Sequence, residues 1–453
     1  MSSSTMSSDG GPTVAVKLFI DKEKKRMLYA ESDKDFVDVL FSFLTLPLGT
    51  IVRLLGKQSQ LGCLDELYKS VETLSEDLFQ TKACKAMLLR PCNAAAAYCS
   101  QLKVKVDDSS RIYRCKNTSC GSGGYSLFSS VADATCRCGE AVQYIRQWTE
   151  KELLRPNKVE SEGGAFVISV PKFIITDDLQ VAPASTRVMF SLIDKFGIPE
   201  KGNIEEKVLQ LNSSKIVSLL ERALLTKQPL TGLCFDVAID LSVTDLCKLP
   251  ENLFGKHVEA DPKFRAINVR LVLSKEDSVL YAEVGKYFVD LAFGLLCIPL
   301  GTIMKTFSQL PQVGCIDNIY KSIGGSAKPE CQTLFLSPKL PPYFGCSSNI
   351  LQVEESDPRY LFIESNYYSE WNPKSSSDRA YKGGHIKFMV TNDLHIHPFC
   401  LTNTLKFLRA SKIPTGKLVQ KELTLNQTQV LKLVGAAFGT REALSSLLLP
   451  LNK

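Results

Sequence analysis

Histidine and tryptophan are scarce in this chain, which has four His and two Trp among 453 residues. So few His leave little room for His-based catalysis or for a metal centre with several imidazole ligands. There is also no G-x-x-x-x-G-K-[ST] phosphate loop, no G-x-G-x-x-G and no G-x-S-x-G nucleophile elbow. The motifs of the common nucleotide-binding enzymes and of the α/β-hydrolases are therefore missing.

A strong charge imbalance is lacking as well. Lys and Arg total 54 against 48 for Asp and Glu, a net charge of +6 that is mild for this length. Nucleic acid is an unfavoured partner on this ground. The two most apolar stretches, Phe36–Val52 and Tyr287–Ile303, each contain an Asp near the start and a Pro-Leu-Gly break near the end. They are predicted to be buried core helices rather than membrane spans.

The first twelve residues, Met1–Pro12, have no apolar core and no basic flank, so they do not resemble a secretory signal. We expect a disordered tail over residues 1–13 and an intracellular protein, cytoplasmic or nuclear. In a reducing compartment its 15 Cys would be thiols or metal ligands rather than disulfides.

An internal repeat organises the chain. Residues 29–51 and 281–303 share 14 identities in 23 positions, and Gln60–Ser70 matches Gln312–Ser322 at the same offset of 252. This pattern predicts two tandem copies of one unit, over residues 14–235 and 267–453, joined by a connection over residues 236–266.

Each unit is predicted to be α+β, because its helical and strand patterns do not alternate regularly. In the first copy a hairpin is expected over residues 14–31, and a helix that starts near Asp33 is expected to end at Pro47. A further helix is expected to start near Cys63. The remaining predicted elements are strands over Lys85–Leu89 and Phe166–Thr176 and helices over Ser185–Phe196 and Ser213–Leu225.

One motif is chemically specific: Cys115, Cys120, Cys136 and Cys138 are spaced C-x4-C-x15-C-x-C and followed by Gly139. Two close pairs of thiolates separated by a loop suit tetrahedral Zn²⁺, with no position open for catalysis. The segment 112–142 is therefore predicted to be a knuckle around a structural zinc ion, with the sulfurs within ~4 Å of one another. Four unrelated thiols or a redox pair remain the alternatives.

The second copy lacks these cysteines. A rough alignment places Ile363 and Tyr368 where the first copy has Cys115 and Cys120, and the Ser-rich loop over residues 372–380 has no Cys. The second copy must hold this region by packing alone or leave it loose.

The sequence resembles a plant family named for domain of unknown function 674. The resemblance rests on Val16–Asp21 (VKLFID), Asp35–Asp38 (DFVD), Leu46–Thr50 (LPLGT) and the paired cysteines, and it covers nearly the whole chain. The family usually has Cys-Pro-Cys-Gly, where this chain has Arg137 between the last two cysteines. No agreed activity is attached to the family, so the resemblance implies a fold and no mechanism.

Three other groups of residues have side chains that could form a site. Cys63 and Cys315 recur in Gly-Cys-[Leu/Ile]-Asp and would suit a reactive thiol at a helix start, but no His is near them in sequence, and a small core residue is favoured.

His395, His397 and Cys400 are spaced for a metal ion, although an exposed strand is the favoured interpretation.

Asp38 and Asp290, with Glu31 and Glu283, recur in both copies and would suit acid–base chemistry, but a carboxylate near a helix start needs only the helix dipole to explain it. The charged turn Lys22–Arg26 is expected to be a solvated loop.

These observations favour a non-enzymatic binding or scaffold protein with a structural zinc ion in the first copy and a protein partner. An enzyme with a pocket between the copies and a zinc-dependent nucleic-acid binder stay open as alternatives. The sequence does not determine the oligomeric state.

Overall fold

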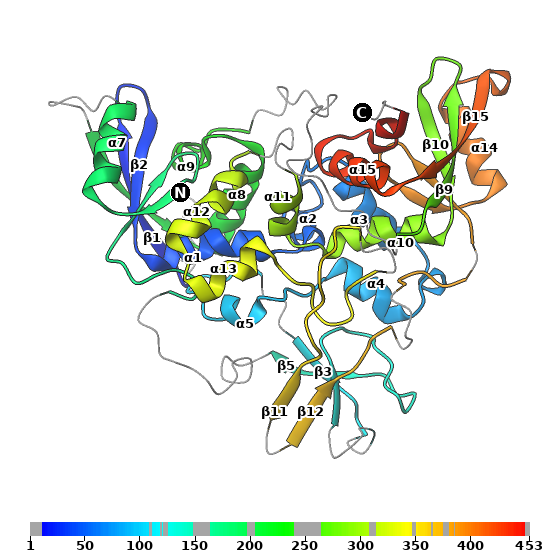
Figure 1. The fold of residues 1–453 in the computed structure, drawn as a ribbon, viewed down its shortest axis with the longest axis horizontal. Coiled ribbons are helices and arrows are strands. Elements are labelled where there is room, and N and C mark those ends of the chain that lie inside the picture. The colour runs from blue at the N-terminus through cyan, green and yellow to red at the C-terminus, as the bar shows by residue number, and fades with distance from the viewer. Residues whose placement is uncertain are drawn as a thin grey trace, which may run out of the picture.

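The structure is a computed structural model that describes residues 11–107, 111–117, 120, 126–147, 164–196, 204–239, 264–307, 314–346, 350–363, 366–374, 380–384 and 386–448. Most of the predicted tail and of the predicted connection lies outside these ranges. The described residues form three five-stranded sheets with helices between them, which confirms the predicted α+β class. Two sheets lie at opposite ends of the molecule, and the third lies below the helices at the centre (Figure 1).

The first outer sheet has the strand order β7-β6-β2-β1-β8. Its strands are β1 (Val14–Asp21), β2 (Arg26–Ser32), β6 (Phe173–Thr176), β7 (Val181–Pro183) and β8 (Ile204–Leu211). Strands β1 and β2 pair antiparallel across an exposed charged turn, which confirms the predicted hairpin. Alternate residues of β1 are fully buried, as expected for a sheet with one face on the core.

The second outer sheet has the order β14-β13-β10-β9-β15. Its strands are β9 (Ile267–Ser274), β10 (Val279–Val284), β13 (Phe388–Thr391), β14 (Ile396–Pro398) and β15 (Leu418–Leu425). Each strand occupies the position of its counterpart in the first sheet. The origin of this correspondence in a tandem duplication, and the copy boundaries, stay predictions.

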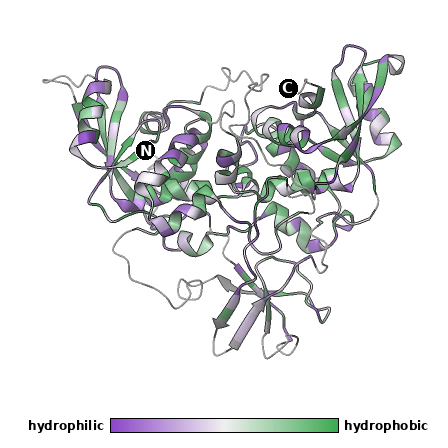
Figure 2. Ribbon diagram, viewed as in Figure 1, coloured by the Kyte–Doolittle hydropathy of each residue, from purple (hydrophilic) through white to green (hydrophobic). Residues whose placement is uncertain are grey.

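The helices lie mostly between the outer sheets, and hydrophobic segments run through both the helices and these sheets (Figure 2). In the first half they are α1 (Lys34–Ser42), α2 (Leu48–Leu54), α3 (Leu64–Thr73), α4 (Lys82–Leu89), α5 (Ala96–Cys99), α7 (Thr186–Phe196), α8 (Ser213–Leu225) and α9 (Pro229–Cys234). In the second half they are α10 (Lys286–Gly294), α11 (Leu300–Thr306), α12 (Ile316–Ser326), α13 (Pro329–Leu336), α14 (Leu401–Ala410) and α15 (Gln427–Gly439). Short 3₁₀ turns cover Phe43–Thr45, Glu76–Leu78, Leu295–Cys297, Thr415–Lys417 and Ala443–Leu448.

Local sequence explains where the first helices begin and end. The Asp33 carboxylate accepts a hydrogen bond from the backbone N–H of Asp35 (3.1 Å) and so caps α1. Pro47 lies beyond the 3₁₀ turn that follows α1 and serves as the N-cap of α2. Among the described residues no helix is long and apolar enough to span a membrane, and both apolar stretches form these buried, interrupted helices.

Two strand predictions need correction. Lys85–Leu89 is not a strand but the end of α4, whose N-cap hydroxyl on Thr81 accepts a hydrogen bond from the N–H of Cys84 (3.3 Å). A short apolar run fits either a buried strand or a buried helix, so its hydrophobic periodicity does not distinguish the two. Of the predicted strand Phe166–Thr176 only β6, its last four residues, is a strand within a sheet.

One helix from each half packs beside the sheet of the other half. The Ser322 hydroxyl on α12 accepts a hydrogen bond from the N–H of Val181 in β7 (2.9 Å). The Ser70 hydroxyl on α3 likewise accepts a hydrogen bond from the N–H of Ile396 in β14 (2.8 Å). Because of this exchange, the two halves share one continuous hydrophobic core.

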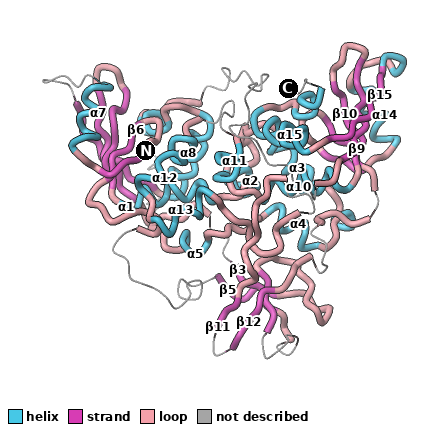
Figure 3. Tube along the Cα trace, viewed as in Figure 1, coloured by secondary structure: helices cyan, strands magenta, loops and turns pink. Residues whose placement is uncertain are grey.

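The third sheet combines strands of both halves in the order β11-β12-β4-β3-β5 (Figure 3). Its strands are β3 (Arg111–Arg114), β4 (Ser126–Ser129), β5 (Gln143–Gln147), β11 (Tyr360–Ile363) and β12 (Asn366–Glu370). Hairpins β3–β4 and β11–β12 meet where β4 and β12 pair in parallel. The region of the second half that has no cysteines is thus a strand hairpin joined to the first half.

Candidate metal centre

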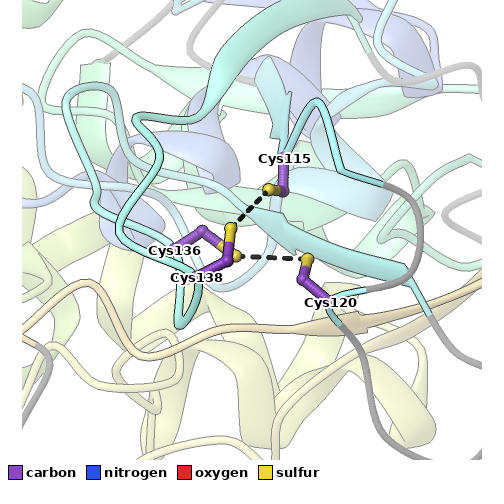
Figure 4. A group of neighbouring side chains, drawn as sticks. All are labelled: Cys115, Cys120, Cys136 and Cys138. Atoms are coloured by element: carbon purple, nitrogen blue, oxygen red, sulfur yellow. Dashed lines mark hydrogen bonds between the residues drawn. The ribbon is translucent and has the colours of Figure 1, made fainter.

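The four motif cysteines converge at one end of the third sheet (Figure 4). The Sγ atoms of Cys115, Cys120, Cys136 and Cys138 all lie within 4.8 Å of one another. Two pairs are in contact: Cys115–Cys138 (3.4 Å) and Cys120–Cys136 (3.3 Å). These separations are too long for disulfides, whose S–S bond is ~2.05 Å. The two measured separations lie within the ~4 Å expected between sulfurs around tetrahedral zinc.

Strand pairing places the first ligand pair. β3 runs antiparallel to β4, and the ladder continues to Cys115, whose N–H donates to the carbonyl of Leu127 (3.3 Å). Cys120 follows five residues later, and its N–H donates to the carbonyl of Asn117 (3.4 Å). The loop after β3 therefore turns back on itself and brings the second sulfur beside the first.

A tight turn places the second pair. The Gly139 N–H donates to the carbonyl of Cys136 (2.9 Å), and the Cys136 N–H donates to the carbonyl of Glu140 (2.8 Å). Gly139 has φ of +87°, a backbone conformation that residues with a Cβ rarely adopt. Cys136 and Cys138 thus flank a single residue in a narrow knuckle, as the sequence predicted.

The electrostatic environment differs among the four thiols. Burial raises the pKa of Cys115 and of Cys136, whereas the backbone N–H of Glu140 lowers the pKa of the exposed Cys138. Since the cluster contains sulfur donors alone, its chemistry suits a thiophilic metal ion in a closed tetrahedral shell. Among the described residues this is the single group of three or more His, Cys, Asp or Glu close enough to hold a metal ion.

Side chains of the second half hold the knuckle in place, and sequence reasoning missed them. The Ser130 hydroxyl donates to Glu370 (2.6 Å), which also forms a two-point ion pair with Arg359 (2.6 and 2.8 Å). The Trp371 indole N–H donates to the carbonyl of Thr135 next to Cys136 (3.0 Å). Because the chain has only two Trp, Trp371 could have been singled out from the sequence as a candidate contact residue. Nothing local in the sequence indicated the buried ion pair.

The recurring cysteines Cys63 and Cys315 do not lie in an open site. Both are buried, and burial raises the pKa of the Cys63 thiol to about 12 and that of Cys315 well above its usual range. Each is the N-cap of an exchanged helix, and its N–H donates to the carbonyl of Ala437 or Ala223 (both 2.8 Å). The motif marks the contact between the halves, which supports the favoured core interpretation.

The two histidines stack on each other instead of facing Cys400. Their ring centroids are 4.3 Å apart, and His395 Nδ1 lies 2.7 Å from the Glu66 carboxylate on α3. Cys400 is the exposed N-cap of α14. His395 and His397 thus join the contact between the halves and form no metal group with Cys400.

The recurring carboxylates are also tied to the fold. Buried Asp38 accepts hydrogen bonds from the N–H groups of Ala165, Phe166 and Val167 (2.5–3.0 Å), and Asp290 accepts two from Tyr381 and Lys382 (both 2.9 Å). Burial outweighs these bonds and raises the pKa of each carboxyl to about 6. Glu283 pairs with Arg270 (3.2 Å). These contacts position loops and give no acid–base pair.

Comparison with protein families agrees with this arrangement. The model of the family described as "Protein of unknown function (DUF674)" matches residues 10–428, nearly the whole chain. The chain belongs to this family. Neither the comparison with curated proteins nor the comparison with solved structures finds a match. The family membership covers both halves and the cysteine knuckle, and it brings no activity with it.

Proposed function

We propose that this DUF674 protein is a non-enzymatic binding or scaffold protein whose third sheet is held by one structural Zn²⁺ ion. The observation that supports it is the convergence of four sulfur donors, with no carboxylate or imidazole among them, at the end of a sheet built by both halves. Four thiolates would fill a tetrahedral shell and leave no position for substrate. The metal would stabilise the sheet and perform no chemistry.

Metal analysis tests this proposal. Protein purified under reducing conditions should contain about one zinc per chain. Cys138→Ser should lose it, because a hydroxyl is a poor zinc ligand. Cys400→Ser is the matched control, since Cys400 is also exposed and backbone N–H groups also lower the pKa of its thiol. Full zinc content in Cys138→Ser, or iron in place of zinc, would contradict the proposal.

The partner proposed for this scaffold is a protein. Helix α7 presents Met189, Phe190 and Ile193 to solvent, with Phe190 58% exposed. Neighbouring exposed apolar side chains of this kind mark protein interfaces more often than isolated ones do. A photo-crosslinking residue at position 190 should give one defined adduct with a different protein. An adduct between two copies of this chain, or none, would contradict the proposal.

A further inference from the structure

A cavity of about 270 Å³ lies where the helical layer meets the third sheet, next to the cysteine knuckle. Three arginines line it: Arg53 from α2, Arg90 from the end of α4 and Arg111 from β3. Among the described residues of the lining, Asp107 is the one acidic side chain, so their charged groups sum to +2. None of these residues belongs to the cysteine cluster.

The acid inside the cavity neutralises only part of this charge. Asp107 Oδ1 lies 2.5 Å from Arg53 Nη2, and the Asp107 side chain is only 10% exposed. The other two arginines leave the described lining with a net positive charge beside this pair. That charge favours an anion over a neutral or cationic ligand.

The rest of the lining is largely apolar. Leu54, Ala86, Val106 and Val131 form walls between the arginines, and Ser130 adds a hydroxyl. Pockets for drug-sized ligands have volumes of roughly 300–1,000 Å³, so this one fits a smaller molecule. Guanidinium groups bind phosphate oxygens in a fork geometry, and apolar walls can cover a short carbon skeleton.

We propose that this cavity binds a small organic phosphate. The arginines would hold the phosphate group, and the apolar walls would exclude water from the carbon part of the ligand. Partial enclosure favours this ligand over a nucleic-acid strand, which requires an open groove along several nucleotides.

The cavity is connected to the metal centre through the chain. Ser130 and Val131 form one wall just before Cys136, and Tyr113 in the same lining is two residues before Cys115. A metal ion that fixes the knuckle would also fix these walls. The link between the cavity walls and the knuckle depends on the proposed zinc ion. Binding of a phosphate by the arginines does not depend on it.

Calorimetric titration of the full chain with glycerol 3-phosphate, and with inorganic phosphate and glycerol separately, tests the proposal. Glycerol 3-phosphate should bind more tightly than inorganic phosphate, and glycerol should not bind. Arg111→Gln should weaken binding roughly tenfold or more, as loss of a charge-assisted contact does. Arg53→Gln should do the same, but it also leaves Asp107 unpaired, so Arg111→Gln is the cleaner variant.

The second half provides a matched control. Lys305 on α11 is the residue 252 positions after Arg53, and its ammonium donates to the Ser337 hydroxyl (2.9 Å). Lys305→Gln should leave phosphate binding unchanged. Metal content should stay at the wild-type level in Arg111→Gln, so failure of the arginine site is distinguishable from failure of the zinc site. No binding of any phosphate, equal binding by Arg111→Gln, or tighter binding of a short RNA oligonucleotide would overturn the proposal.

Discussion

The outer sheets and the third sheet are stabilised in different ways. Each outer sheet has one face in the continuous core that both halves share, and it is locked by a helix from the other half. On the far side of the third sheet, the described residues form a cluster of four buried side chains: Ile112, Phe128, Leu361 and Tyr368. A cluster of that size provides little hydrophobic stabilisation. Cys115 and Cys136 belong to the main core, and the Arg359–Glu370 pair ties the end of β12 to the segment just before β11.

Within the third sheet the two hairpins differ as well. Cys115 and Cys120 lie between β3 and β4, and Cys136 and Cys138 follow β4, whereas the ion pair and Trp371 flank the β11–β12 hairpin. Since β4 and β12 are paired, neither hairpin is independent of the other. Loss of the metal should therefore loosen β11–β12 as well as β3–β4, while the outer sheet of the second half persists.

Metal removal should have the largest effect. Binding of zinc by thiolates is coupled to folding by an apparent free energy on the order of 10 kcal/mol in small sites. After chelation, amide hydrogen exchange should rise in β3, β4, β11 and β12 and stay slow in β1 and β9. Uniform loosening of all three sheets would show that the outer sheets depend on the metal too.

Removal of the buried carboxylate at position 370 should have the next largest effect. Glu370→Ala leaves the partly buried Arg359 side chain, 28% exposed, without this carboxylate, so the cost should be near the lower end of the ~3–5 kcal/mol typical of breaking a buried pair. Chemical unfolding should show a destabilised third sheet that still holds its metal. Glu370→Gln keeps an oxygen that accepts the hydrogen bond from the Ser130 hydroxyl, and it should recover part of the loss. Unchanged stability in Glu370→Ala would mean that the metal alone holds the sheet.

A smaller effect is expected at the contact between the halves. A Cβ at Gly314 would lie 2.3 Å from the Ala223 carbonyl oxygen, so Gly314→Ala should destabilise the outer sheets by about 1–3 kcal/mol. Gly324 on α12 has nothing within 4 Å of such a Cβ, and Gly324→Ala should be neutral or slightly stabilising. The midpoint temperatures of thermal unfolding of Gly314→Ala and Gly324→Ala measure this difference. Equal midpoints would contradict the close approach of the halves.

The smallest effect is the pH dependence of the outer sheets. The pKa of Asp38 rises from 3.8 to about 6 on folding, so its contribution to stability is present below pH ~4 and is lost as the pH rises through 6. The stability difference between wild type and Asp38→Asn should therefore shift by about 1 kcal/mol between pH 5 and 7.5, with wild type relatively more stable at pH 5. Urea unfolding at both pH values measures this. A constant difference would mean that Asp38 keeps its ordinary pKa.

Sequence reasoning succeeded where local chemistry decides. The charged turn of the β1–β2 hairpin, the Asp33 cap and the cysteine spacing each indicate a short-range structure, and each is present. It failed at Lys85–Leu89, where a short apolar run fits both helix and strand. It could not foresee the exchange of α3 and α12 or the Ser130–Glu370 bond, because these join residues more than 100 positions apart.

X-ray absorption at the zinc edge of the purified protein would identify the ligands of the proposed zinc ion. Four thiolate ligands predict four sulfur neighbours at ~2.3 Å and no nitrogen or oxygen in the first shell. In Cys138→Ser the four-sulfur signal should disappear, while Cys400→Ser should match wild type. A first shell with imidazole nitrogen or carboxylate oxygen, or a chain without zinc, would contradict the account.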